Sequence, residues 1–281
     1  MVFAPERSKM QTEPQTRTVR PPAVAGTFYP REPDRLRVQV QSLLADVGPS
    51  KAVIPKAVIA PHAGYVYSGH VAAAAFATLR GRAQGIKRVV LIGPAHYLPV
   101  RGIAAPTVDD FETPLGRTPI DASALTDIVN LPFVLRNDAP HVPEHALEVE
   151  LPFLQMLLST FRIVPLIVGD AAAQSVAEVL RLLWGGPETL IVVSSDLSHY
   201  HSYEAARRLD AVTAAAIERG DWVSLRPEQA CGCLAVSGLL IEASRRGLTA
   251  ERLALCNSGD TAGSRDSVVG YGAWMFASGT L

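Results

Sequence analysis

The stretch LIVVSSDLSH, residues 190–199, decides the fold and points to the functional site. It begins with four consecutive apolar residues and a serine, a pattern typical of a short strand that is covered on both faces of a sheet. Asp196 and His199 follow directly after that strand. In open α/β sheets, ligands bind beyond the carboxyl ends of the strands. The stretch therefore predicts both a buried strand and a ligand site at its end.

Five further segments resemble this strand in being short and largely apolar. They are residues 57–60, 88–93, 163–168, 253–256 and 268–275. Between them, apolar side chains recur at the helical spacing i, i+3, i+4, i+7, most clearly over residues 176–183 and 209–216. A third helix is predicted over residues 231–245, before Gly247. Pro152 lies within another helical stripe and predicts either a helix start or a kink there.

This alternation of strands and helices predicts a three-layer α/β/α sandwich around a mostly parallel or mixed sheet. Residues 1–18 are polar, lack any hydrophobic period and are predicted to be a flexible tail. Residues 19–281 are predicted to form a single α/β domain. The alternative is a pair of half-domains that meet near residues 120–145, where the pattern is weakest.

Composition excludes several classes of protein. Of the 281 residues, 48% are hydrophobic and 19% are charged, which is enough for a large core. A formal net charge of −1 argues against binding to nucleic acid or to an anionic membrane. The longest apolar run, residues 71–77, is far shorter than the ~20 residues of a membrane span. With three cysteines and no secretory signal, the chain is expected to be cytoplasmic.

Histidines follow three of the predicted strands. His62 comes after residues 57–60, His96 after residues 88–93, and His199 after residues 190–194, in a chain with only seven histidines. A single histidine of this kind is usually a hydrogen-bonded loop residue, but three at equivalent places predict a shared metal or catalytic site. Neutral imidazole is a common ligand of Zn, Cu and Fe.

Cys231 and Cys233 are candidates for a further ligand, because they open the helix predicted over residues 231–245. A helix N-terminus favours the thiolate over the thiol. Two residues along a helix turn a side chain by ~200°, so both sulfurs would not face one ion. Cys231, nearer the helix start, is the favoured ligand, and the alternative is that both residues pack under the helix. Cys256 is predicted to belong to the core.

The remaining histidines carry weaker signals. His145 lies between Glu144 and Glu148, and it either hydrogen-bonds into the cleft or belongs to a helix with a solvated acidic face. His70, His141 and His201 are expected to be surface or core residues. Motifs of other chemistries are absent from the sequence, including the GxxxxGK[ST] phosphate loop, the GxSxG nucleophile elbow and the HExxH zinc motif.

Seven motifs, in this order, resemble those of the Memo family, whose prokaryotic members are called AmmeMemoRadiSam system protein B. They are VRPPAVAGTFYP (19–30), PHAGY (61–65), GPAH (93–96), EHALE (144–148), SSDLSH (194–199), CG (231–232) and NSGD (257–260). The resemblance runs from about residue 19 to residue 277, nearly the whole chain.

The resemblance implies the fold of the LigB-type class III extradiol dioxygenases, in which two histidines and a carboxylate hold iron. In Memo-type proteins a cysteine replaces the carboxylate, and the matching positions are His62, His96 and Cys231. One mononuclear ion is therefore expected, Fe(II) or Cu in the first place and Zn as a further option. By the same resemblance Asp196, His199 and His145 line the pocket, the first two as orienting residue and acid/base. Phe28 stands where some members carry tryptophan.

Two classes of function follow from the resemblance. The first is a metal-dependent redox enzyme or oxygenase, and the polar residues around the pocket favour it. The second is a metal-binding or peptide-binding adaptor, which the exchange of a carboxylate for a thiolate favours. The expected partners are a small-molecule or peptide ligand in the pocket, together with radical-SAM and Amme-type proteins. Nucleic acid and membrane are not expected partners.

Overall fold

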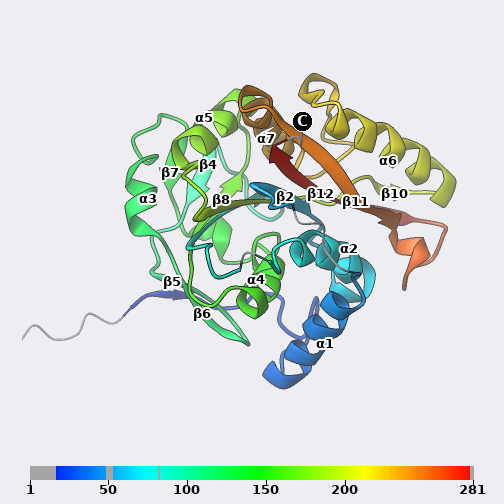
Figure 1. Cartoon of the computed structure of the whole chain (residues 1–281), viewed down its shortest axis with the longest axis horizontal. Helices are drawn as coiled ribbons and strands as arrows, with labels where there is room; N and C mark the ends of the chain where they lie inside the picture. The colour runs from blue at the N-terminus through cyan, green and yellow to red at the C-terminus, as the bar shows by residue number, and fades with distance from the viewer. Residues whose placement is uncertain (1–16, 49–52, 82, 279–281) are drawn as a thin grey trace, which may run out of the picture.

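A computed structural model describes residues 17–48, 53–81 and 83–278. Figure 1 shows it with its longest axis horizontal. Most of the predicted tail lies outside the described residues. Its last two residues do not: the backbone N–H of Thr18 donates to Oδ2 of Asp109 at 2.8 Å. Nε of Arg17 donates to Oδ2 of Asp110 at 2.7 Å. The described chain is therefore attached to the domain from its first residues onward.

A mixed sheet of nine strands forms the middle of the molecule, in the order β10-β12-β2-β9-β3-β8-β4-β7, with β11 paired to β12. The strands are β2 (Ala57–Ala60), β3 (Arg88–Pro94), β4 (Ile103–Ala105), β7 (Val134–Arg136), β8 (Arg162–Val168), β9 (Thr189–Ser194), β10 (His199–His201), β11 (Leu248–Asn257) and β12 (Val268–Ser278). A second, three-stranded sheet contains β1 (Val19–Arg20), β5 (Asp110–Thr113) and β6 (Gly116–Pro119).

The four central strands β2, β9, β3 and β8 run parallel to one another. All four belong to the predicted set, and nearly every residue in them is buried. Such strands have no solvent face, which is why their sequences are continuous apolar runs. Because they are parallel, their carboxyl ends lie at one edge of the sheet, and the residues after them converge there.

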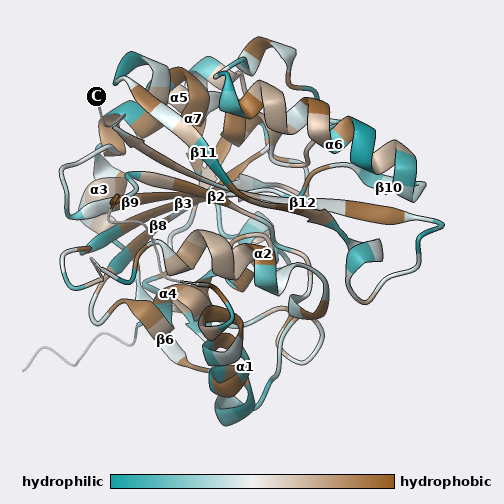
Figure 2. Ribbon diagram, turned by 45° about the vertical axis from the view of Figure 1, so that its right-hand side comes forward, coloured by the Kyte–Doolittle hydropathy of each residue, from teal (hydrophilic) through white to brown (hydrophobic). Residues whose placement is uncertain are grey.

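Helices cover both faces, as Figure 2 shows with the sheet nearly edge-on. One face carries α5 (Ala173–Leu183), α6 (Tyr203–Glu218) and α7 (Cys233–Arg245), and the other carries α1 (Pro33–Ala45), α2 (Tyr65–Ala77) and α4 (Leu151–Leu157). The short helix α3 (Ala122–Thr126) lies beside β8 at the far edge. This is the predicted three-layer α/β/α sandwich, and its sheet is mixed.

Three details differ from the sequence prediction or decide between its alternatives. Pro152 lies in the first turn of α4, so it starts a helix and does not kink one. Strand β11 is longer than residues 253–256, because backbone pairing with β12 carries it through the charged residues Glu251 and Arg252. Residues 103–136 add β4 and β7 to the edge of the same nine-stranded sheet.

Candidate metal site

The carboxyl ends of β2, β3 and β9 bring their following residues to one place. His62 follows β2, His96 follows β3 and Asp196 follows β9, and all three line a single cavity. Within the described ranges, the ligand atoms of His62, His96 and His145 lie within 4.8 Å of one another, a spacing that can hold a metal ion. The ring centroids are 5.1 Å apart for His62 and His96, and 4.7 Å apart for His96 and His145.

The imidazole of His62 is fully buried and is held from its Nδ1 side. Nδ1 lies 2.7 Å from Oγ of Ser194, and Nε2 lies 3.3 Å from Sγ of Cys231. Burial lowers the pKa of His62 well below its usual value, and the neighbouring His96 lowers it further. A neutral imidazole whose Nδ1 is engaged presents Nε2 as a ligand atom.

His96 is held in the same way by Glu144. Nδ1 of His96 lies 2.9 Å from Oε1 of Glu144, whose other oxygen accepts from the backbone N–H of His96 at 2.7 Å. Oε1 also accepts from the backbone N–H groups of His145 and Ala146, both at 2.9 Å. Burial alone would raise the pKa of Glu144, but the hydrogen bonds from His96 and Ala146 outweigh it and lower the pKa to about 2. His96 is thus backed by a charged carboxylate.

His145 is the third member of the histidine group. Its ring stacks on His96 with an interplanar angle of 22°, and Phe28 lies against it at 4.7 Å between ring centroids. Nδ1 lies 3.3 Å from Oε1 of Glu144, without the geometry of a hydrogen bond. Burial and the nearby His62 lower the pKa of His145 to about 4. His145 therefore lines the cleft as a neutral imidazole, and its Nδ1 has no hydrogen-bond partner among the described residues.

The acidic neighbours of His145 are not a solvated helix face, and that alternative is wrong. Glu144 and Glu148 are both buried. Glu148 points away from the cleft to the N-terminal motif, where it accepts from Arg20, from the hydroxyl of Tyr29 and from the backbone N–H of Ala23. This buried ion pair holds residues 19–30 against the domain and places Phe28 in the cavity wall.

Cys231 reaches the site from the residues just before helix α7. Its Sγ lies near His62 and 3.6 Å from the carbonyl oxygen of Asp196. The helix begins at Cys233, two residues later than predicted, so Cys231 lies outside its N-terminus. Burial and the charge of Asp196 raise the pKa of its thiol, contrary to the expectation that a helix N-terminus would favour the thiolate. Cys233 is buried at the helix start and is not among the residues that line the main cavity.

Gly232 explains how Cys231 comes so close to the strand end. Its backbone N–H donates to Oγ of Ser195 at 3.0 Å. A Cβ atom at this position would lie 2.7 Å from Cβ of Ser195 and 2.8 Å from the carbonyl oxygen of Ser194. Only glycine allows this approach without displacing backbone, and the approach brings the Cys231 sulfur to the carboxyl end of β9.

Asp196 and His199 line the cavity beside the histidine group. Oδ1 of Asp196 accepts from the backbone N–H of His62 at 2.8 Å, and Oδ2 lies 4.0 Å from Nε2 of His62. Burial raises the pKa of Asp196, and the nearby His199 opposes that shift. His199 is half-buried in β10, where the register of pairing with β12 shifts between His199 and His201.

The cavity has a volume of about 1150 Å³, with the histidine group at its wall and aromatic and apolar side chains at its mouth. Val66 and Tyr200 are 62% and 79% exposed, and Tyr97 lies beside His145 at 5.7 Å between ring centroids. Tyr200 has a φ of +62°, the one positive φ among the described residues other than glycine. Strained residues of this kind are common at ligand sites.

The residues that could hold a metal ion fit one well. The imidazoles of His62 and His96 have Nδ1 engaged by Ser194 and Glu144, the arrangement usual for histidines that bind a metal through Nε2, and their ligand atoms belong to one group within 4.8 Å. The sulfur of Cys231 lies at hydrogen-bond distance, 3.3 Å, from Nε2 of His62, and the imidazole of His145 completes the group of three histidines. This donor set of nitrogen and sulfur suits Cu, Zn or Fe and does not suit Mg or Ca.

Known proteins are similar to this sequence over nearly its whole length. The profile of the family described as Memo-like protein matches residues 20–275. The chain belongs to the Memo family. It is 35% identical to a MEMO1 family protein of Aquifex aeolicus over 272 residues, which cover 92% of this chain and 99% of that protein. It is 34% identical to a MEMO1 family protein of Sulfolobus acidocaldarius over 279 residues, which cover 90% and 97% of the two chains.

Other sequence expectations can be compared with the structure. His141 is buried and His70 and His201 are exposed, as expected, although His201 also lines the cavity. Cys256 is only half-buried, and its Sγ lies 3.4 Å from Nε2 of His70. None of the helices in the described part of the chain has the length and apolar character to cross a membrane. Ser194 and Arg20 lie within the motifs SSDLSH and VRPPAVAGTFYP, but the sequence assigned neither of them a role, because their partners are distant along the chain.

Proposed function

We propose that this Memo-family protein binds one redox-active metal ion, Fe(II) or Cu, through His62, His96 and Cys231. The observation that carries the proposal is the close grouping of the ligand atoms of His62 and His96, with Sγ of Cys231 3.3 Å from Nε2 of His62. Zn is also compatible with this donor set. The position of His145 in the same group makes it a further donor in the proposed site.

We propose a metal-dependent redox reaction on a small molecule in the cavity. A bound Fe or Cu ion would supply one-electron redox chemistry or oxygen activation, which these side chains lack by themselves. The volume of about 1150 Å³ admits a substrate beside the histidines. His199 is proposed as the acid/base, because it lines the cavity and lies outside the histidine group. Asp196, buried between His62 and the cavity, is proposed to orient the substrate or His199.

The wide mouth of the cavity favours a second candidate function, a non-enzymatic adaptor that binds a peptide or a partner protein. Exposed apolar and aromatic side chains such as Val66 and Tyr200 surround that mouth. Under this alternative the metal would stabilise the binding surface, and a radical-SAM or Amme-type protein would be the partner. The two functions differ in whether the metal-loaded protein turns over a substrate.

Anaerobic purification and elemental analysis test the metal site. We expect one Fe or Cu ion per chain in the wild type and a strong loss of affinity in Cys231→Ser. Cys233→Ser is the matched control, since Cys233 lies two residues away and is not among the residues lining the main cavity. Its metal content should stay near the wild-type value. Equal losses in both variants would overturn the assignment of Cys231.

Oxygen consumption separates the enzyme from the adaptor. The reconstituted protein is assayed in air with small phenols and thiols, and His199→Gln is compared with the wild type for metal content, melting temperature and turnover. The enzymatic proposal expects turnover in the wild type, and a His199→Gln variant that keeps its metal while losing turnover. If the variant loses its metal together with its activity, the purely catalytic role of His199 is overturned.

A further inference from the structure

Ser194, the last residue of β9, lies between His62 and the buried side chain of Glu150. Its Oγ is 2.7 Å from Nδ1 of His62, 2.8 Å from Oε1 of Glu150 and 2.7 Å from the carbonyl oxygen of Ala146. All three distances are those of hydrogen bonds. Ser194 is completely buried, so no water competes for these contacts.

The chemistry of the four groups fixes where the protons lie. A serine hydroxyl has one proton to donate and two lone pairs that accept. The carbonyl oxygen of Ala146 can only accept, so the hydroxyl proton of Ser194 must point to it. The two remaining neighbours, Oε1 of Glu150 and Nδ1 of His62, must then both donate to Oγ. An ionised carboxylate has no proton to donate.

We propose that Glu150 is a neutral carboxylic acid whose O–H donates to Ser194 and thereby fixes His62 in the tautomer that carries its proton on Nδ1. Glu150 is then a positioning residue, which acts on the proposed metal site through Ser194 and makes no contact with the ion. The value of this arrangement for metal binding rests on the proposed function above, because it keeps the lone pair of Nε2 directed toward Cys231.

The surroundings of Glu150 agree with the neutral form. The side chain is fully buried, and its second oxygen, Oε2, has no hydrogen-bond partner among the described residues. A buried charge with an unpartnered oxygen is costly, whereas a neutral acid is much less so. Burial raises the pKa of Glu150 well above its usual range; the hydrogen bond with Ser194 opposes this shift without cancelling it, and the nearby carboxyl of Asp196 adds to it.

Glu144 shows what a charged carboxylate requires at the same depth. It accepts hydrogen bonds from three backbone N–H groups as well as from the ring of His96. Among the residues that the structure describes, the Glu150 side chain has one hydrogen-bond neighbour, Ser194. The two histidines of the proposed site are therefore supported differently: His96 by an anion and His62 by a neutral chain of hydroxyl and carboxylic acid.

Infrared spectroscopy of the metal-free protein at neutral pH tests the protonation state. We expect the carbonyl stretch of a protonated carboxylic acid in the wild type, and a difference spectrum against Glu150→Gln in which that band is lost. Glu144→Gln is the matched control and should keep the band, since Glu144 is ionised. If Glu150→Gln does not fold, Ser194→Ala should shift the band instead, because it removes the acceptor. The proposal would be overturned if the wild type lacked the band. It would also be overturned if neither Glu150→Gln nor Ser194→Ala altered the band.

Nitrogen NMR of the histidine rings tests the tautomer independently of any metal. In the metal-free wild type and in Glu150→Gln, His62 should carry its proton on Nδ1, because the carboxamide N–H replaces the acid O–H as the donor to Ser194. Ser194→Ala should give a mixture of tautomers. A wild-type His62 with its proton on Nε2 would overturn the proposal.

Metal titration then distinguishes this inference from the proposed function. We expect an affinity within about 3-fold of the wild type for Glu150→Gln, and a loss of about 10–100-fold for Ser194→Ala, as is typical when the partner of a metal-bound histidine is removed. If the infrared and NMR results hold but the wild type binds no metal, the proposed function fails and the protonation of Glu150 stands.

Discussion

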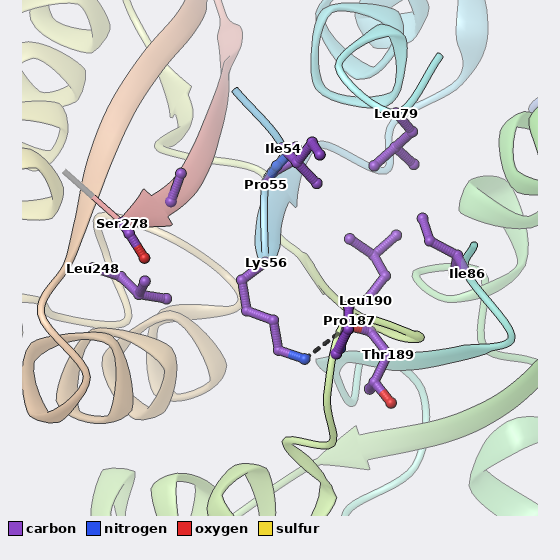
Figure 3. A pocket seen from close by; sticks show the side chains of 11 residues that line it. Ile54, Pro55, Lys56, Leu79, Ile86, Pro187, Thr189, Leu190, Leu248 and Ser278 are labelled. Atoms are coloured by element: carbon purple, nitrogen blue, oxygen red, sulfur yellow. Dashed lines mark hydrogen bonds between the residues drawn. The ribbon is translucent and has the colours of Figure 1, made fainter. Parts of the chain in front are cut away.

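At the carboxyl ends of β2, β3 and β9, the nitrogen and sulfur atoms of the proposed metal site gather at one cavity, whereas at the amino ends of β2 and β9 the ammonium group of Lys56 is bound by backbone carbonyl oxygens. His62, His96 and Cys231 all line a cavity of about 1150 Å³. Lys56, just before β2, donates instead to three carbonyl oxygens, those of Trp184, Gly186 and Thr189. Figure 3 shows its side chain reaching toward the start of β9.

The cavity beside Lys56 is about 190 Å³ and is lined mainly by apolar residues such as Ile54, Leu79 and Leu248. An ammonium group has three protons, and here three carbonyls receive them. At the amino ends of β2 and β9, the ammonium group of Lys56 therefore stabilises the fold and has no N–H left to donate to a ligand. Burial of a polar side chain is therefore not enough to make a ligand site. A site also needs several ligand atoms that lie close together beside one cavity.

The largest effect is expected from breaking the ion pair that fixes the N-terminal motif at the carboxyl end. Glu148→Ala leaves the guanidinium of Arg20 buried without its partner, and removal of one partner of a buried pair costs about 3–5 kcal/mol of unfolding free energy. Urea denaturation measures the loss. Glu112→Ala, which breaks a more exposed pair with Arg117 at 3.1 Å, should cost less than about 1 kcal/mol. Equal losses would contradict the structural role of Glu148.

Metal affinity should depend on the charged support of His96. Glu144→Gln removes the negative charge behind Nδ1 of His96, and we expect a loss of affinity of about 10–100-fold in Cu or Fe(II) titrations. The same titration on Lys56→Met should give the wild-type affinity, because Lys56 lies at the opposite end of the strands. An unchanged affinity in Glu144→Gln would show that His96 is not a ligand.

Stability should respond to Lys56 although metal binding does not. Lys56→Met removes the ammonium donor from the part-buried carbonyl oxygens of Trp184 and Thr189, and we expect a loss of about 2 kcal/mol of unfolding free energy, the usual cost of unsatisfied buried polar groups. The carbonyl oxygen of Gly186 keeps the backbone N–H of Thr189 as a donor. Thermal or urea unfolding measures the loss. A variant as stable as the wild type would mean that water replaces the ammonium, and the contrast between the two ends would then be weaker.

Stability is also expected to depend on pH. Burial lowers the pKa of His141 from 6.5 to about 4. Between these values the unfolded chain binds a proton that the folded chain does not, so the unfolding free energy falls as pH decreases, by about 1.4 kcal/mol per pH unit for one histidine. In the metal-free protein, His141→Gln should lower this slope by the contribution of one histidine, about 1.4 kcal/mol per pH unit. A slope in His141→Gln equal to that of the wild type would contradict the lowered pKa of His141.

The sequence by itself determined the central sheet and the residues that follow its strands. A strand covered on both faces must be apolar throughout, so β2, β3, β8 and β9 can be recognised from short apolar runs. Parallel strands end at one edge, so His62, His96 and Asp196 could be predicted to lie together. These conclusions need only local pattern and the topology of parallel sheets.

Only the tertiary structure decided how those residues are supported. Ser194 and Ala146 are 48 positions apart, and Arg20 and Glu148 are 128 apart, yet each pair is in direct contact. The start of α7 two residues after Cys231 likewise follows from the contact of Gly232 with Ser195, which no local pattern contains. A hydrogen-bond partner is chosen by proximity in the folded chain, so proton positions and charges in the site cannot be predicted from spacing along the sequence.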